Sequence, residues 1–304
     1  AMDTFVHRQS PDIAGAVDTS KERREGVSDN QMDWFQGAGD QGVMIGYACD
    51  ETKQLMPIPV VLANRIVREL SACRQSSYIQ GILPDGKAQV TVEYENGKPV
   101  RLDSVVVSCQ HTEDKNLKKL EAEIRKKVLL PALRLLPPDE DTKIFINPSG
   151  RFVCGGMDAD TGLTGRKLMV DSYGSMVPHG GGAFSGKDCS KVDRSVAYMA
   201  RYIAKNIVAA RLASRCQVSL AYAIGVAQPV MVQVDTFGTG KVCADDCLEL
   251  AIPLVFGLTP KQIVDSLRLT RPIFRQPAAF GHFGRKEFPW ERTDKVEALR
   301  NAVI

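Results

Sequence analysis

The sequence predicts an α+β fold, in which sheets are covered by helices on one face. Segments with strand character come in neighbouring pairs, such as Lys87–Tyr94 and Pro99–Ser108, which flank the hairpin dipeptide Asn96-Gly97. Segments with helical periodicity follow these pairs in blocks and do not alternate with single strands. That order is typical of α+β units and not of parallel βαβ folds.

The individual elements follow from periodicity. Val43–Tyr47 is predicted as a strand, and a helix follows Pro59 because Leu62, Ile66 and Leu70 recur every four residues. The remaining predicted elements are helices at 114–133, 191–212, 244–251 and 259–269, and strands at 143–146, 167–173, 217–224 and 230–237.

Composition narrows the class of protein. The 304 residues are 44% hydrophobic and 25% charged, which is ordinary for a globular chain of two or three compact units. The formal net charge of +3 is too small to suggest nucleic-acid binding by charge alone. No apolar run is long enough for a membrane helix, and residues 1–10 lack the apolar core of a signal peptide.

The eight cysteines are scattered without framework spacing. This favours reduced thiols and a cytoplasmic protein. Cys243 and Cys247 lie close in sequence, but they make a poor zinc site without a second pair or a partnering histidine.

A polar, charged segment, Val17–Phe35, is predicted to be a mobile loop. Two interpretations remain open for it: a solvated linker, or a lid that closes over a site. A domain boundary is placed near Phe152–Gly156.

The most distinctive motif is the glycine loop, which we define as residues 179–188, His-Gly-Gly-Gly-Ala-Phe-Ser-Gly-Lys-Asp. Successive glycines let backbone N–H groups surround an anion. Residues 181–187 fit the first part of a P-loop, but Asp188 stands where a P-loop needs Ser or Thr to hold magnesium. A generic glycine turn is the alternative. The nearby Lys187, Lys191 and Arg194 favour phosphate binding.

Two further clusters carry charge. Asp158, Asp160, Arg166 and Lys167 surround Gly162–Gly165, and such groups can neutralise a polyphosphate or hold a metal or an ammonium group. Exposed loop charges are usually only solvated, which is the alternative for this cluster. The third cluster is Gly-Ala-Gly-Asp-Gln-Gly at residues 37–42, whose alternative is a flexible turn. For His179 and His282 a hydrogen-bonded structural role is predicted.

These three motifs together resemble signatures of the methionine adenosyltransferase (S-adenosylmethionine synthetase) family. The resemblance covers nearly the whole chain from Gln9 onward. It implies three similar α+β units per subunit, here with the first unit incomplete. The implied domains are a remnant and mobile loop at 1–35, a central unit at 36–153 and a C-terminal unit at 154–304.

The resemblance also implies a chemistry. Methionine sulfur attacks the 5′ carbon of ATP, and tripolyphosphate leaves and is hydrolysed to diphosphate and phosphate. Mg²⁺ and K⁺ assist. The implied enzyme is a cytoplasmic homodimer or tetramer with sites between subunits, acting on ATP and L-methionine, without nucleic acid or membrane as partner.

Residue roles are carried over by motif. The residues implied to bind ATP are Asp85, Lys87, Arg151, Phe152, Asp160, Arg166, Lys167, Ala183 and Lys187. Those implied to lie near methionine are Gln9, Asp40, Asp160 and Lys191. Asp193 is implied to face magnesium, and the implied catalytic residues are Lys87, Asp160, Lys167 and Lys187.

The sequence departs from the family at several points. The N-terminal His-Pro-Asp-Lys motif is absent, which implies that an N-terminal segment is missing. Leu83 stands where the family usually has arginine, residues 157–161 differ around Asp160, and the loop at 17–35 is longer than usual. An alternative function is therefore a catalytically inactive regulatory or scaffold subunit of the same family.

Overall fold

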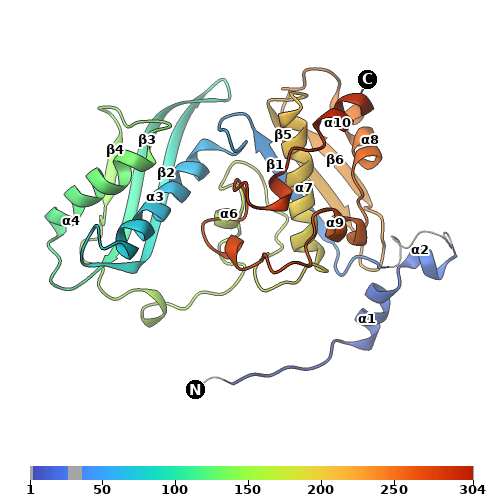
Figure 1. The fold of residues 1–304 in the computed structure, drawn as a ribbon, viewed down its shortest axis with the longest axis horizontal. Coiled ribbons are helices and arrows are strands. Elements are labelled where there is room, and N and C mark those ends of the chain that lie inside the picture. The colour runs from blue at the N-terminus through green and yellow to red at the C-terminus, as the bar shows by residue number, and fades with distance from the viewer. Residues whose placement is uncertain (1–2, 27–35, 304) are drawn as a thin grey trace. The chain divides into compact units, whose positions relative to one another are not determined.

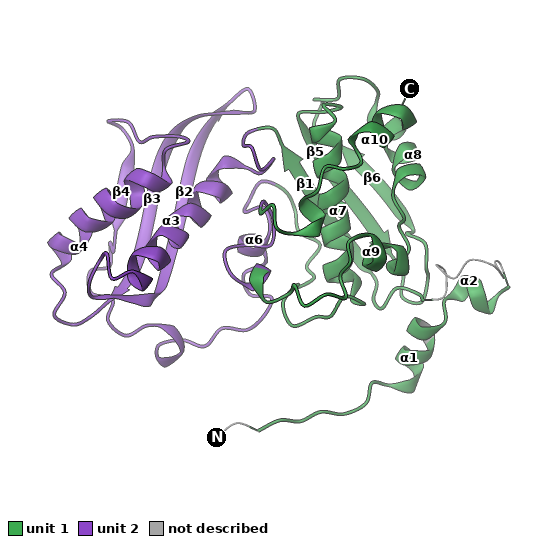
Figure 2. Cartoon of the chain, in the orientation of Figure 1, with its two compact units in different colours: residues 1–50, 177–276, 285–304 green, residues 51–176, 277–284 purple. Residues whose placement is uncertain are grey.

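The structure is a computed structural model that describes residues 3–26 and 36–303. The chain forms two compact units (Figure 2). Unit 1 comprises residues 1–50, 177–276 and 285–304, and unit 2 comprises residues 51–176 and 277–284. In the described part of the chain each unit holds one three-stranded sheet together with helices, which confirms the α+β prediction.

The sheet of unit 2 has the order β2-β3-β4. Strands β2 (Ile82–Glu95) and β3 (Lys98–His111) form the predicted antiparallel hairpin, and β4 (Lys143–Ile146) runs parallel to β3. Helices α3 (Ile58–Gln75) and α4 (Leu117–Ile124) cover one face of the sheet (Figure 1). Their apolar faces and alternate strand residues make one core cluster, because side chains of a strand point to its two faces in turn.

The opposite face of this sheet, which we call the open face, carries a cross-strand row of Gln89, Val106 and Phe145. Their strand neighbours Val105, Val107 and Ile146 belong to or pack against the core. Phe145 is 45% exposed, so the open face presents apolar as well as polar side chains.

The predicted helix at 114–133 is interrupted. After α4 the chain forms a π-helical turn, η2 (Arg125–Leu129), followed by the short α5 (Leu130–Ala132). Pro131 accounts for the interruption, because it has no N–H to donate to the carbonyl of Lys127, four residues earlier. The thiol of Cys73 lies 3.9 Å from that carbonyl oxygen and donates to it instead.

The sheet of unit 1 is antiparallel, with the order β1-β5-β6. Its strands are β1 (Gly42–Cys49), β5 (Arg215–Tyr222) and β6 (Met231–Asp235). The long helix α7 (Val192–Ala209) packs across β1 and β5 (Figure 1). All four of these elements were predicted from the sequence, with ends shifted by up to three residues.

Three shorter helices complete the layer: α8 (Asp245–Val255) packs on β6, α9 (Pro260–Ser266) on α7, and α10 (Val296–Ala302) on both α7 and α8. The start of α9 is fixed by a capping box between Thr259 and Gln262. In the described residues no single helix is long and apolar enough to cross a membrane. The bent pair formed by α8 and α9 meets that test by length and composition only.

A buried ion cluster fixes the C-terminal segment to α7. The carboxylate of Glu291, in the 3₁₀ turn η5 (Pro289–Glu291), accepts hydrogen bonds from Arg201 at 2.8 and 3.0 Å and from Lys205 at 2.7 Å. The Glu291 and Arg201 side chains are fully buried. Trp290 next to it stacks on Tyr198 of α7 with ring centroids 3.7 Å apart.

Two predictions were wrong. The predicted strand at 167–173 is the helical turn α6 (Leu168–Asp171), in which the Asp171 N–H donates to the Lys167 carbonyl at 3.0 Å. A consecutive apolar run does not distinguish strand from helix, and a strand also needs a neighbour for its backbone hydrogen bonds.

The other wrong prediction concerns the beginning of the 17–35 loop. Residues 11–18 form helix α1 (Pro11–Asp18), and Lys21–Arg24 form α2, where the Ser20 hydroxyl accepts from the Arg23 N–H at 3.3 Å. The Glu22 carboxylate accepts from the Ala227 N–H at 2.9 Å, which ties α2 to the β5–β6 connection. Residues 27–35 lie outside the described residues.

Candidate active site

The glycine loop of unit 1 folds against the start of α7. Lys187 in the loop pairs with the carboxylate of Asp193, which lies in the first turn of α7. The guanidinium of Arg194 donates to the Lys187 carbonyl at 2.7 Å and lies over the Phe274 ring at 3.7 Å. The loop therefore has its cation and its carboxylate in fixed positions, with a buried arginine beneath them.

The 37–42 motif lies next to the glycine loop. An added Cβ at Gly180 would lie 1.6 Å from the carbonyl oxygen of Val43, the residue that directly follows the motif. Such a contact is impossible, so only glycine permits this approach of the loop to β1. The structure thus brings two of the three predicted motifs together within one unit.

Burial and hydrogen bonding set the charge states of two side chains in the loop. Burial lowers the pKa of His179, although Asp193 acts in the opposite sense, so the imidazole is neutral near pH 7. Its Nδ1 accepts from the Gly181 N–H at 2.8 Å, which is the structural role predicted for this histidine. Burial opposes ionisation of Asp188, but hydrogen bonds from Ser190 prevail and lower the pKa of that carboxyl group.

The other predicted residues of unit 1 are less tightly held. Asp40 is exposed and accepts from the neighbouring Gln41 N–H at 2.8 Å. Lys191 is the residue before α7, and Ala183 is half-buried in the loop. Gln9 is exposed in the N-terminal segment and, among the described residues, makes no hydrogen bond to the loop.

In unit 2 the predicted residues group around the end of the sheet. The Asp85 carboxylate, at the start of β2, accepts from the Gly156 N–H at 2.8 Å. Phe152 is anchored by His111, whose N–H donates to the Phe152 carbonyl at 2.9 Å. Arg151 pairs with Glu113 at 2.6 Å on the surface, and Lys87 projects from β2 into solvent.

The second charged cluster follows this segment as an exposed turn. The Asp160 N–H donates to the Gly156 carbonyl at 3.0 Å, and Lys167 donates to the Arg166 carbonyl at 3.1 Å. The side chains of Asp160, Arg166 and Lys167 are exposed. His282, buried in unit 2, donates its N–H to the Asp171 carbonyl at 3.0 Å, in keeping with a structural role.

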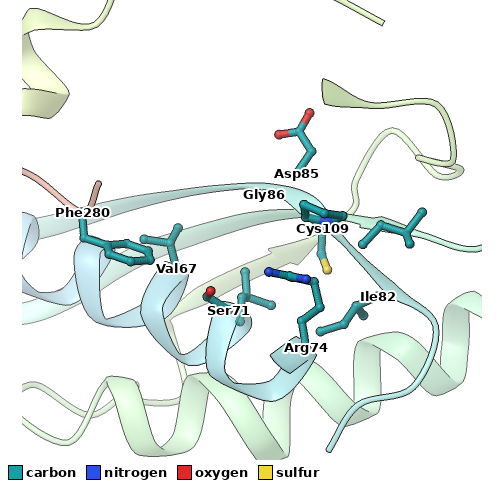
Figure 3. A pocket seen from close by; sticks show the side chains of 11 residues that line it. Val67, Ser71, Arg74, Ile82, Asp85, Gly86, Cys109 and Phe280 are labelled. Carbon is teal, nitrogen blue, oxygen red and sulfur yellow. The ribbon is translucent and has the colours of Figure 1, made fainter. Parts of the chain in front are cut away.

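A pocket of about 140 Å³ lies beneath Asp85. Figure 3 shows its wall of α3 residues, with Ser71 and Arg74 facing the start of β2 and the thiol of Cys109. Phe280 closes one end. Burial raises the pKa of Cys109 to about 11, so this thiol is protonated near neutral pH.

The sequence reasoning missed Gln110 and His111, which hold the 151–156 segment in unit 2. The sequence feature that could have predicted them is a pair of polar residues directly after the largely apolar strand segment Val105–Cys109. Within the described part of the chain, no group of three or more His, Cys, Asp or Glu side chains gathers as a metal cluster. All eight cysteines are free thiols.

Comparison with known proteins agrees with these motifs. The S-adenosylmethionine synthetase central domain matches residues 35–152, and the C-terminal domain of the same family matches residues 154–292. The two matches adjoin near residue 153, whereas the compact units join β1 to β5 and β6 across that point. The domain limits drawn from the sequence stay a prediction.

A curated relative is similar along nearly the whole chain. It is the S-adenosylmethionine synthase of Desulforudis audaxviator (strain MP104C), with 54% identity over 99% of this chain and 76% of the relative. The glycine loop, the 37–42 motif and the charged turn at 158–167 all lie in the matched ranges. On these grounds the chain belongs to the S-adenosylmethionine synthetase family.

Proposed function

We propose that the chain is a methionine adenosyltransferase, which forms S-adenosylmethionine from ATP and L-methionine and hydrolyses the released tripolyphosphate. The observation that carries this proposal is the glycine loop packed on β1, with Lys187 and Asp193 fixed at the start of α7. Family membership supports the same reaction. No observation favours the alternative of an inactive regulatory subunit.

The reaction places specific demands on these residues. A lone pair of the methionine sulfur forms the new bond to C5′ of ATP, and the C5′–O bond breaks with its electron pair leaving on the triphosphate. Negative charge therefore grows on the leaving oxygen in the transition state. Lys187 and, from unit 2, Lys87, Arg166 and Lys167 are proposed to neutralise that charge, and fixed cations lower such a barrier.

Substrate recognition is divided among the other predicted residues. Asp85, Arg151, Phe152 and Ala183 are proposed to hold the nucleotide, with Phe152 stacked on the base. Gln9, Asp40 and Lys191 are proposed to lie near methionine, where a carboxylate such as Asp40 suits its ammonium group. Asp160 is proposed to contact both substrates.

Mg²⁺ and K⁺ are proposed as cofactors. Magnesium in nucleotide enzymes is usually held by one or two carboxylates together with substrate phosphates and waters. Asp193 fits this as a single carboxylate beside Lys187, which is proposed to bind phosphate. When bound, Mg²⁺ would offset triphosphate charge. Among the described residues, no group of three or more His, Cys, Asp or Glu side chains could hold a metal ion without the substrate.

Assembly and location are also proposals. We propose a cytoplasmic homodimer or tetramer with sites between subunits. Eight free thiols suit a reducing compartment, and the open face of the β2-β3-β4 sheet offers an apolar surface for association.

Three substitutions test the proposed chemistry. Lys187→Ala and Lys167→Ala are expected to lower the single-turnover rate by on the order of a hundredfold, because a preorganised cation is lost. Methionine binding should change little, since neither lysine is assigned to methionine. Asp160→Asn is expected to weaken methionine binding as well as the rate.

The matched control is Lys261→Ala, which removes an exposed lysine–aspartate pair of α9 that is assigned to neither substrate. It should leave both rate and binding unchanged. Near wild-type rates in both lysine variants would reject the phosphate-binding assignment and favour a purely structural glycine turn.

A further inference from the structure

Two buried polar residues end β3 in unit 2 without a role in the proposed chemistry. Gln110 is 9% exposed and His111 is 2% exposed. Both side chains reach the 151–156 segment, which carries the proposed nucleotide contacts Arg151 and Phe152. Burying a polar side chain costs free energy unless it is hydrogen-bonded. The hydrogen-bond partners of Gln110 and His111 therefore indicate the structural role of each side chain.

Gln110 joins two separate parts of the proposed nucleotide site. Its Oε1 accepts from the Asp85 N–H at 3.1 Å, and its Nε2 donates to the Val153 carbonyl at 3.0 Å. The Asp85 carboxylate in turn accepts from the Gly156 N–H at 2.8 Å. An added Cβ at Gly155 would lie 2.7 Å from Cδ of Gln110, so the segment passes directly against this amide.

The partners of His111 define its protonation state. Its Nδ1 lies 2.8 Å from the Thr112 carbonyl oxygen, which can only accept, so Nδ1 carries a hydrogen. Its Nε2 lies 3.0 Å from the Phe152 backbone nitrogen, which can only donate, so Nε2 carries none. The ring is therefore the neutral Nδ1–H tautomer, and an imidazolium would set two donors against each other at Phe152.

We propose that Gln110 and His111 are positioning residues that clamp the 151–156 segment to Asp85 and so set the affinity for the nucleotide. The inference deepens the proposed function and rests on it for the identity of the ligand. Neither side chain is assigned to a substrate, so each acts through the backbone that it holds. Their loss should affect ATP and leave methionine untouched.

The tautomer is tested first, on the unsubstituted protein. Two-bond ¹H–¹⁵N correlation spectra of the histidine rings should show His111 as the Nδ1–H form near neutral pH. The Phe152 amide should exchange slowly, because it donates to Nε2. An Nε2–H ring at His111, or rapid exchange at Phe152, would overturn the clamp.

Paired variants distinguish a role in positioning the 151–156 segment from a general effect on protein stability. His111→Gln places an amide oxygen near the site of Nε2 and can still accept from Phe152, whereas His111→Asn is too short to reach it. We expect His111→Asn to raise the KM for ATP roughly tenfold, since a buried donor loses its partner, and His111→Gln to stay near wild type. Gln110→Met should raise the KM for ATP to a similar extent as His111→Asn. Gln75→Met, on the exposed end of α3, is the control and should leave this KM unchanged.

The outcomes distinguish the clamp from the proposed function. Equal KM values for ATP in the Asn and Gln variants, or equal changes for ATP and methionine, would refute the clamp while the enzyme still made S-adenosylmethionine. A protein with the expected tautomer and slow exchange at Phe152 but no S-adenosylmethionine formation would refute the proposed function. The hydrogen-bonded clamp itself would then stand.

Discussion

At the scale of single residues, burial separates cysteines that are chemically alike. Cys109 lines the pocket beneath Asp85, and burial raises the pKa of its thiol to about 11, whereas Cys154 and Cys247 are exposed. Since the thiolate is the reactive form, the Cys109 thiol is protected from modification both by its protonation and by its burial.

Labelling of the native protein with a maleimide near pH 8 should therefore modify Cys154 and Cys247 quickly. Cys109 should react only after unfolding, and peptide mass spectrometry would locate the label. Modification of Cys109 as fast as Cys154 would show that the pocket beneath Asp85 opens to solvent in the native state.

Some elements of the fold could be predicted from the sequence, whereas some side-chain contacts could not, and the reason is physical. Helices α3 and α7 and the β2–β3 hairpin were predictable because their signals are local: apolar residues on one face of α3, a run rich in alanine in α7, and an Asn-Gly turn in the hairpin. Gln110 and His111 were missed because their partners are about forty positions away in sequence. The roles assigned to the charged residues stay predictions, since they concern bound substrates.

At the scale of elements, contacts between residues distant in sequence also explain why α6 and the π-helical turn were not predicted. Residues 167–173 are apolar enough for either a strand or a helix, and only the absence of a pairing neighbour in the described sheets settles the choice. The interruption after α4 has a local cause in Pro131, but the donor that satisfies the Lys127 carbonyl is the thiol of Cys73, which belongs to another helix. Strand pairing and the Cys73 contact are both long-range, so periodicity does not predict them.

The contact between η5 and α7 is an element-scale feature with a measurable stability. Burial of Glu291 opposes its ionisation, but Arg201 and Lys205 prevail and hold the pKa of that carboxyl group below its usual range. A carboxyl group with a lowered pKa in the folded state contributes stability above its unfolded pKa of about 4.3. That contribution is lost as the pH falls through the folded pKa.

Glu291→Gln should lower the free energy of unfolding near pH 7 by about 3–5 kcal/mol, because it leaves Arg201 and Lys205 buried without their counter-charge. The loss of stability on acidification should also become shallower. Urea denaturation across the pH range is the measurement. Glu297→Gln, which removes the exposed pair with Arg300, should cost less than about 1 kcal/mol; an equal cost for both variants would contradict the argument.

At the scale of the whole molecule, the open face of the β2-β3-β4 sheet is proposed to mediate self-association. Phe145 and Val106 are neighbours across β3 and β4 on this face, and Phe145 is 45% exposed. Sedimentation at micromolar concentration should show a dimer or larger species. Phe145→Glu should shift it towards monomer, because a charge is buried without a partner.

Leu130→Glu is the matched control, since Leu130 is 67% exposed but lies on α5 and not on the sheet. It should leave the oligomeric state unchanged. Sedimentation of the unsubstituted protein as monomer alone would exclude self-association, and a dimer that resists Phe145→Glu would place the interface elsewhere.

The approach of Gly180 to β1 has a consequence for directed evolution of this enzyme. The group that a new side chain at position 180 would strike is the backbone carbonyl of Val43, which every amino acid carries. A second-site substitution in β1 therefore cannot make room, as it often can when two side chains collide. Saturation libraries at position 180 should return glycine alone, even when β1 is randomised with it, and diversification of the loop should begin at positions whose neighbours are side chains.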